Sequence, residues 1–418
     1  MGPLGHSVAA LTALVGAPLL GGALLLRPRW RTGLSERFGA HPALGSAQRP
    51  IWVHGASVGE VRAALPLLDA LGKRGHALAL STMTTTGRAV AREARPALAA
   101  GLAPLDHPWL VARALARVRP RALVFVETEL WPSWVRAAAE RGIPALVMSG
   151  RLSERSFARW QRAPGLLRPT LARYAAIAAR SDADAARFVA LGAKPGRVLV
   201  CGDLKLDAPP PRPASGELVA MLGTTPLVVA GSTHEGEEAA ALAALVALER
   251  AGLSAALVIA PRHPERFERA AQLIRSAGRT LRRRSLPTSF ALAAGEVLLL
   301  DTLGELASLY AHARVAFVGG TLVPIGGHNL LEPALVGCPV LFGPHLAKAR
   351  ESAALLLAAG AARQVPDAAG LAAALVETLA APELAALRGA RGRAALVAHR
   401  GATERSVALI ERVLGGAA

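Results

Sequence analysis

The feature that most constrains this chain is an alternation of short apolar segments with alanine-rich helical stretches, which starts at residue 51. Such alternation predicts βαβ units, and therefore parallel sheets with helices on both faces. We expect strands at residues 51–54, 77–80, 122–126, 145–148, 175–178, 198–200, 227–230, 255–260, 297–300, 315–318 and 340–342, and helices at residues 61–71, 131–140, 371–379 and 383–414 among others.

A proline-rich segment divides the alternation into two halves. Residues 207–216 hold four prolines within five positions, which form neither a helix nor a central strand and make a stiff spacer. In a chain of 418 residues each half is long enough for its own core. We expect one α/β domain over residues 31–206, the linker at 207–216 and a second α/β domain over 217–418.

The first 30 residues differ from the rest of the chain. Residues 7–26 carry no charge, which is just long enough to span a bilayer, and four arginines follow between residues 27 and 37. Arginines on that side would hold the remaining chain in the cytoplasm, and residues 1–6 lack the basic start of a secretory signal. We expect residues 1–30 to form a membrane anchor or embedded helix. The alternative is a soluble helix packed on the first domain.

The net charge of +18 comes almost entirely from arginine. It suits an anionic membrane surface or phosphorylated substrates. Nucleic acid is the weaker interpretation, because the arginines are scattered, aromatics make up 4% of the chain and no binding signature is present. No phosphate loop of the nucleotide triphosphatases occurs. Two isolated cysteines and the lack of paired aspartates at a strand end favour chemistry without a metal or cofactor.

Ligands of parallel sheets bind at the carboxyl ends of the strands, so the loops there are the candidate sites. The first is the loop at residues 54–60, which contains Ser57 and Gly59 and ends at Glu60. A carboxylate at this place is positioned to accept a proton from a substrate hydroxyl. The alternative is a first-turn glutamate that answers the helix dipole.

Glu127 and Glu129 follow the next strand but one. If the extended backbone continues, both side chains point the same way and perturb each other's pKa; helix capping ahead of residue 132 is the alternative.

Arg151, in a third loop, could meet acidic groups of a substrate. Lys205, beside the linker, could stabilise a developing phosphate, or be an ordinary surface lysine.

In the second half, four or more strand ends carry glycine or arginine with polar neighbours. The longest such loop runs from a strand at 315–318 through Gly326 and Gly327 to a short helix at 330–336, an arrangement that directs free backbone N–H groups at an anion. Glu332 in the first turn could reach a ribose hydroxyl. Arg262 and His263 offer donors to a phosphate, and Ser232 begins another helix-preceding loop.

Six motifs of the chain, taken together, resemble those of the 3-deoxy-D-manno-octulosonic acid (Kdo) transferases of lipopolysaccharide synthesis. They are HGASVGE (54–60), ETELWP (127–132), RLSERS (151–156), STHEGE (232–237), PRHPER (261–266) and GGHN with EP (326–329, 332–333). The resemblance covers about residues 27–345. It implies a GT-B fold, with two Rossmann-like domains around a cleft. It also implies an inverting transfer of Kdo from CMP-Kdo to a lipid A precursor at the cytoplasmic face of the inner membrane.

The resemblance also implies residue roles. Glu60 matches the general base, and Glu129 and Lys205 match positions that stabilise the transition state. Ser57, Gly59, Arg151 and Ser232 would line the substrate cleft. The segments matched to CMP binding are Pro261, Arg262 and His263, then Leu303, Gly304 and Glu305, then Gly326, Gly327, His328, Asn329, Leu330, Leu331 and Glu332.

The chain departs from the family pattern at Ser149-Gly150, at Ile325 and after His345, which bears on the acceptor more than on the reaction class. Two alternatives stay open at this point. One is another GT-B transferase or a sugar-nucleotide epimerase that uses a different nucleotide sugar. The other is a non-catalytic CMP-sugar-binding membrane protein.

Overall fold

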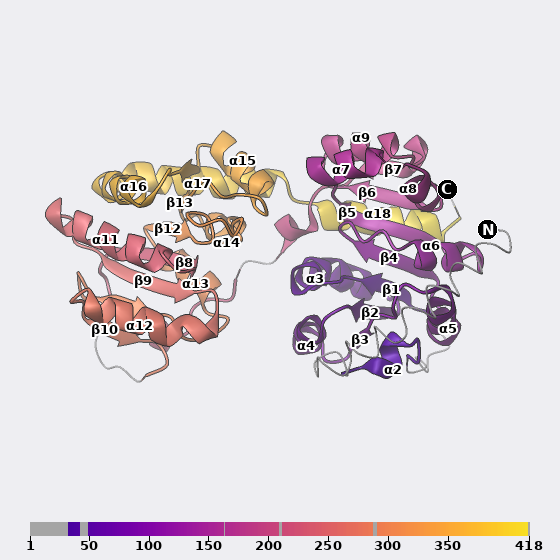
Figure 1. The fold of residues 1–418 in the computed structure, drawn as a ribbon, viewed down its shortest axis with the longest axis horizontal. Coiled ribbons are helices and arrows are strands. Elements are labelled where there is room, and N and C mark those ends of the chain that lie inside the picture. The colour runs from indigo at the N-terminus through magenta and orange to yellow at the C-terminus, as the bar shows by residue number, and fades with distance from the viewer. Residues whose placement is uncertain (1–31, 42–48, 163, 209–210, 287–290, 417–418) are drawn as a thin grey trace. The chain divides into compact units, whose positions relative to one another are not determined.

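The structure is a computed structural model that describes residues 32–41, 49–162, 164–208, 211–286 and 291–416. The chain divides into two compact units (Figure 1): unit 1 comprises Met1–Ala208 with Arg400–Ala418, and unit 2 comprises Pro209–His399. The expected membrane helix at residues 1–30 lies outside the described residues. Of the expected linker, residues 209 and 210 lie outside them as well.

Unit 1 is built on a parallel sheet of seven strands in the order β3-β2-β1-β4-β5-β6-β7. The strands are β1 (Ile51–His54), β2 (Leu78–Thr82), β3 (Ala99–Leu102), β4 (Ala122–Val126), β5 (Ala145–Gly150), β6 (Ala176–Ala179) and β7 (Val198–Val200). The helices are α2 (Leu34–Arg37), α3 (Val58–Lys73), α4 (Thr85–Ala94), α5 (Pro108–Val118), α6 (Pro132–Ala139), α7 (Glu154–Gln161), α8 (Pro164–Leu171), α9 (Asp182–Ala190), α18 (Ala402–Leu414) and the 3-10 helices η2 (Pro195–Arg197) and η3 (Leu204–Asp207).

Helices cover both faces of this sheet because its strands alternate side chains between two cores. Trp52 of β1 packs on the side of α5 and α6, in the same cluster as Trp134. Ile51 and Val53 of β1 point the other way, into a cluster that contains Leu67 of α3 and Ile410 of α18. β1 is buried along its whole length and apolar in its first three residues, as a sheet covered on both faces requires.

Unit 2 repeats the plan with seven parallel strands in the order β10-β11-β9-β8-β12-β13-β14. The strands are β8 (Leu227–Thr233), β9 (Ala256–Pro261), β10 (Leu281–Arg283), β11 (Val297–Leu299), β12 (Val315–Val318), β13 (Val340–Phe342) and β14 (Ala362–Gln364). The helices are α10 (Gly216–Leu222), α11 (Glu237–Arg250), α12 (Phe267–Ser276), α13 (Leu306–Leu309), α14 (Leu331–Leu335), α15 (Arg350–Ala358), α16 (Ala368–Ala380), α17 (Pro382–Ala398) and the 3-10 helices η4 (Pro264–Arg266) and η5 (Tyr310–His312).

The C-terminal helix differs from the expectation. We expected one helix over residues 383–414 within a second domain that ends at 418, but the helix breaks near Gly401, whose φ is 93°. After the break, α18 buries Val407 and Ile410 in the core of unit 1. The apolar stripe of α18 is the physical reason for its return, since it completes the helix layer beside α3.

Among the residues that the structure describes, no single helix is both long and apolar enough to cross a membrane. Only the pair Ala368–Ala380 and Pro382–Leu414, bent by 104°, reaches that length and composition together.

Candidate active site

Glu60 caps the helix that follows β1. The Glu60 N–H donates to Oγ of Ser57 (3.3 Å), while Oε2 of Glu60 accepts from the N–H of Ala56 (2.5 Å) and of Ser57 (3.2 Å). This reciprocal pairing is a capping box. A Cβ at Gly55 would lie 3.1 and 3.2 Å from Glu60 atoms, so a side chain there would require the turn to shift. The Glu60 carboxylate therefore interacts with the N-terminus of α3, as the alternative interpretation of this loop expected.

The Glu60 carboxylate is also electrostatically unusual. Burial raises its pKa above the ordinary value, and the negative charge of Glu127 raises it further, while the hydrogen bonds from Ser57 and Ala56 act in the opposite direction. A carboxylate with a raised pKa is a stronger base. Capping the helix and accepting a proton are thus compatible roles for Glu60.

Glu127, the residue after β4, has an unusual backbone conformation. Its φ of 64° lies in the left-handed region, where residues other than glycine are uncommon, and its N–H donates to the Met148 carbonyl (2.8 Å). The extended geometry therefore stops at Val126, and the expected same-side arrangement of Glu127 and Glu129 does not arise from a continued strand. Instead, the Glu127 carboxylate forms an ion pair with Lys205.

The carboxyl group of Glu129 has a strongly raised pKa. Burial is the main cause that raises its pKa to about 7, and the charges of Glu60 and then Glu127 add to it. The helix-capping alternative is not observed, because Trp131 is the N-cap residue of α6 and no side chain caps that end. Glu60, Glu127 and Glu129 thus form an acidic cluster in unit 1, with Lys205 as the cation paired to it.

Lys205 is held in place by the short 3-10 helix η3. The carboxylate of Asp203 accepts from the Lys205 N–H (3.0 Å) and from the Ser149 hydroxyl (3.3 Å), and Arg180 pairs with its other oxygen (3.2 Å). Ser149 adopts a φ of 55°. Strained residues at strand ends such as Ser149 and Glu127 are typical of functional sites.

The turn between Glu127 and Glu129 also meets the loop after β5. The N–H of Arg151 donates to the Thr128 hydroxyl (3.2 Å), which places Arg151 beside the acidic cluster. Ser57 and Gly59 lie in the first turn of α3 with Glu60. The structure thus brings the expected residues of unit 1 together, whereas Ser232 lies in unit 2, on β8, with a φ of 56°.

The glycine loop of unit 2 does not leave its amides free for a ligand. The N–H groups of Gly326 and Gly327 both donate to the carbonyl of Gly320, at 3.1 and 2.7 Å. The helix that follows, α14, has only five residues. The expectation of free backbone donors directed at an external anion is therefore wrong for this pair of glycines.

The loop instead binds an anion of the protein itself. The Glu237 carboxylate is fully buried and accepts from the N–H of Gly320 (2.7 Å), Thr321 (3.0 Å) and Leu322 (2.9 Å). It also accepts from the His234 N–H (2.9 Å). Four backbone donors compensate a buried charge. Glu237 therefore ties the glycine loop to the end of β8.

Three histidines gather where these segments meet. Nε2 of His234 lies 2.7 Å from Nε2 of His328, and the His263 ring centroid lies 5.5 Å from that of His234. Arg262 precedes His263 after β9, with its N–H bonded to the Thr233 carbonyl (3.0 Å). Of the residues expected to bind CMP, the structure therefore groups His263, Arg262 and His328.

The remaining expected donor-binding residues lie on two turns. Leu303 is 75% exposed, and Glu305 behind it accepts from the Arg284 guanidinium at 3.0 and 3.1 Å. The Asn329 side chain bridges the start of α14: its amide donates to Glu332 (3.1 Å) and its oxygen accepts from the Leu331 N–H (3.1 Å). Both carboxylates are thus engaged by protein donors. Within the described part of the chain, no group of three or more histidine, cysteine or acidic residues is arranged to hold a metal ion.

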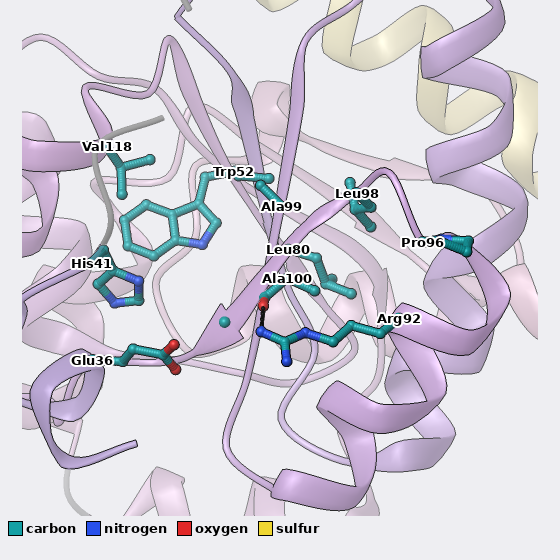
Figure 2. A pocket seen from close by; sticks show the side chains of 12 residues that line it. Glu36, His41, Trp52, Leu80, Arg92, Pro96, Leu98, Ala99, Ala100 and Val118 are labelled. Atoms are coloured by element: carbon teal, nitrogen blue, oxygen red, sulfur yellow. Dashed lines mark hydrogen bonds between the residues drawn. The ribbon is translucent and has the colours of Figure 1, made fainter. Parts of the chain in front are cut away.

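A cavity of about 460 Å³ lies away from these residues, at the β3 edge of unit 1 (Figure 2). His41 and Trp52 form one wall, with ring centroids 5.2 Å apart. Arg92 crosses another side and donates to the Ala100 carbonyl (3.3 Å). None of the predicted site residues lines this cavity, so cavity size does not identify the chemical site.

Comparison with known proteins decides the family. The family model described as 3-deoxy-D-manno-octulosonic-acid transferase (kdotransferase) matches residues 32–208. The chain is 37% identical over 400 residues to the 3-deoxy-D-manno-octulosonic acid transferase of Bordetella pertussis, with 93% of each chain covered. It is 32% identical over 406 residues to the enzyme of that name from Haemophilus influenzae, with 93% and 92% covered. This chain belongs to the Kdo transferase family. It is therefore a glycosyltransferase.

Solved structures more distant from this Kdo transferase show the fold. The UDP-GlcNAc 2-epimerase from Neisseria meningitidis has a TM-score of 0.60 at 12% identity, over 87% of this chain and 100% of the other. Acinetobacter baumannii MurG has a TM-score of 0.55 at 15% identity, over 87% and 99%. Two α/β units, each built on a parallel sheet, and these structural neighbours confirm a GT-B-like architecture.

Several residues of the candidate site were not among the sequence predictions of site residues. They are Asp203, His234 and Glu237, and Glu127 was noted only as a partner of Glu129. Each lies within a few residues of a predicted position, so the motif STHEGE (232–237) was a usable signal for two of them. What the motif could not reveal is that Glu237 bonds a loop 83 residues away.

Proposed function

We propose that this Kdo transferase moves Kdo from CMP-Kdo to a lipid A precursor, lipid IVA, with inversion, at the cytoplasmic face of the inner membrane. In the proposed reaction an acceptor hydroxyl attacks the anomeric carbon and passes its proton to Glu60. The bond from that carbon to the phosphate oxygen breaks, and its electron pair leaves with CMP. The general base is the part of this scheme for which the structure offers the most support.

The observation that carries the proposal is the acidic cluster of unit 1. Glu60 is fixed by a capping box at the carboxyl edge of the sheet, and burial together with Glu127 raises its pKa. Glu129, with a pKa of about 7, exists in both protonation states near neutral pH and can donate a hydrogen bond when protonated. Lys205 adds a positive charge that can stabilise negative charge developing on the departing phosphate.

In this proposal the donor binds to unit 2 through its CMP moiety. Arg262 and His263 follow β9 and lie beside the His234–His328 pair, which supports a phosphate position there. Asn329 orders the start of α14, and Leu303 presents an exposed apolar side chain on the turn that precedes Glu305. Charged donors for a phosphate and an apolar surface for a base are the two elements that a nucleotide needs.

The test is transfer from CMP-Kdo to a tetra-acylated lipid A precursor by the full-length protein. We expect the wild type to be active and Glu60→Gln to lose turnover by about 10²–10⁴-fold, because a general base contributes that much. Glu93→Gln, an exposed glutamate of α4, is the matched control and should keep full activity. Full turnover in Glu60→Gln would remove Glu60 from the mechanism. Wild-type activity on a uridine sugar without any transfer from CMP-Kdo would refute the proposed donor.

A further inference from the structure

The imidazole rings of His234 and His328 meet edge to edge. Their Nε2 atoms lie 2.7 Å apart, their centroids 5.0 Å apart, and their planes differ by only 2°. Rings stacked face to face stay about 3.5 Å apart because of van der Waals contact, so atoms at 2.7 Å place the two rings nearly in one plane. At this distance a proton must lie between the two nitrogens. The pair is therefore joined by an N–H···N hydrogen bond.

The fold holds this pair from both sides through one carboxylate. Glu237 accepts from the backbone N–H groups of His234 (2.9 Å) and Gly320 (2.7 Å). Gly320 has a φ of 68°, and a Cβ there would lie 2.9 Å from the His328 ring. Only a glycine thus leaves room for the His328 imidazole against the loop. The short contact between the rings is a consequence of this rigid frame.

The surroundings of the pair are mainly cationic. His328 is half-buried and faces His234, Arg262, Lys348 and His263; burial first, and then these groups, lower its pKa to about 4. Burial also lowers the pKa of His234, which faces Glu237, His263, Arg266 and Arg262; among these only Glu237 opposes the effect. Without a bound anion, the pair is therefore neutral, with one proton between its Nε2 atoms, and its cationic neighbours oppose the uptake of a further proton.

We propose that the His234–His328 pair takes up a proton from solvent when the phosphate of a cytidine nucleotide binds beside Arg262 and Lys348. The inference rests on the proposed binding of CMP-Kdo to unit 2. A bound phosphate cancels the repulsion from the two cations, so the pair becomes an imidazolium–imidazole with the proton shared between the Nε2 atoms and both Nδ1 atoms protonated. No proton passes to the substrate. Nucleotide affinity is therefore coupled to pH through this pair.

The test is calorimetric titration of the full-length protein with CMP at pH 7.5, in two buffers that differ in ionisation enthalpy. The dependence of the measured heat on the buffer gives the number of protons taken up. We expect uptake of a fraction of a proton per CMP, and an affinity that rises about threefold for each unit of pH decrease between 8 and 6, which corresponds to about half a proton. The CMP phosphate is already largely dianionic at pH 7.5, and binding next to cationic side chains can only make it release protons. Any proton uptake must therefore come from groups of the protein.

Two variants locate the proton. His328→Gln keeps a hydrogen-bonding side chain of similar size but cannot be protonated, and it should bind CMP without proton uptake and without a rise in affinity as the pH falls from 8 to 6. His312→Gln, an exposed histidine of η5, should behave as the wild type. CMP binding by the wild type without proton uptake, or uptake that persists in His328→Gln, would overturn the inference alone. Failure of the folded wild type to bind CMP would overturn the proposed donor site together with it.

Discussion

At the scale of single residues, the three glutamates of unit 1 differ in what surrounds each carboxylate. Glu60 accepts two backbone N–H groups, and Glu127 pairs with Lys205. Glu129 instead experiences burial and two like charges, and it has a pKa of about 7. Neighbouring carboxylates with separated pKa values are a common basis for distinct acid and base roles. In the proposed mechanism Glu60 is the base, and its two backbone donors hold the carboxylate in place.

Glu129→Gln should stabilise the protein in a pH-dependent way. Because folding raises the pKa of Glu129 from 4.5 to about 7, its ionisation opposes folding above pH 7 and has no effect well below 4.5. The contribution of Glu129 to the free energy of unfolding therefore falls as the pH rises from 4.5 to about 7. The variant should gain about 1–2 kcal/mol over wild type at pH 8, after allowance for solvent screening, and little at pH 4.5.

Thermal unfolding at the two pH values measures this effect, with Glu93→Gln as the control for loss of an exposed carboxylate. An equal gain for Glu129→Gln at both pH values would show that Glu129 is not held in the electrostatic state described above.

At the scale of secondary-structure elements, the loops that follow strands hold the candidate catalytic residues, and short elements position them. The 3-10 helix η3 places Lys205, and Asp203 and Asp207 lie immediately before it and at its end. Asp207 accepts from the N–H of Gly401 (2.8 Å) and of Thr403 (2.5 Å), and thereby caps α18. One aspartate thus links the element that carries Lys205 to the helix that completes the core of unit 1.

Asp207→Ala should therefore lower both stability and activity. Loss of a helix cap costs about 1 kcal/mol, and release of η3 should reduce Kdo transfer because Lys205 is no longer held against Glu127. Asp367→Ala is the matched control, since Asp367 caps α16 in unit 2 through the Gly370 N–H (2.8 Å). It should lose similar stability but keep turnover. Equal turnover in the two variants at a temperature where both are folded would show that η3 is held by other contacts.

At the scale of the whole molecule, the chain forms two α/β units, of which unit 1 is discontinuous in sequence. The chain leaves unit 1 after Ala208 and returns to it at Arg400. The first crossing is marked by prolines, whereas the second is marked only by the break near Gly401. This is why the expected second domain, residues 217–418, extends too far at its C-terminal end.

Residues 1–30 belong to the same scale, and the membrane anchor there stays a prediction. Deletion of residues 7–26 should move the protein from the membrane fraction to the soluble fraction and reduce transfer to a lipid acceptor, because the segment removed is the long uncharged stretch of the chain. Binding of CMP to the deletion variant serves as the control for folding. Intact protein in the soluble fraction, together with a fully active deletion variant, would contradict the anchor.

The strands absent from the sequence expectations share one physical property. They are β3, β10 and β14, and each lies at an edge of its sheet. An edge strand is covered less completely, so β10 (LRR) and β14 (ARQ) keep charged residues and β3 (AAGL) keeps small ones. Central strands must be apolar on both faces, and for that reason hydrophobicity revealed them.

The sequence by itself determined the α/β class, the two halves, the Kdo transferase family and the candidate acids, because strand periodicity, prolines and short motifs are local properties. Only the tertiary structure decided which groups meet: that Glu237 occupies the amides of the glycine loop, that Glu127 joins Lys205, and that α18 returns to unit 1. These contacts join residues far apart in the chain: the first two form because parallel strands bring their carboxyl ends to one edge, and the third forms because the apolar face of α18 packs in the core of unit 1.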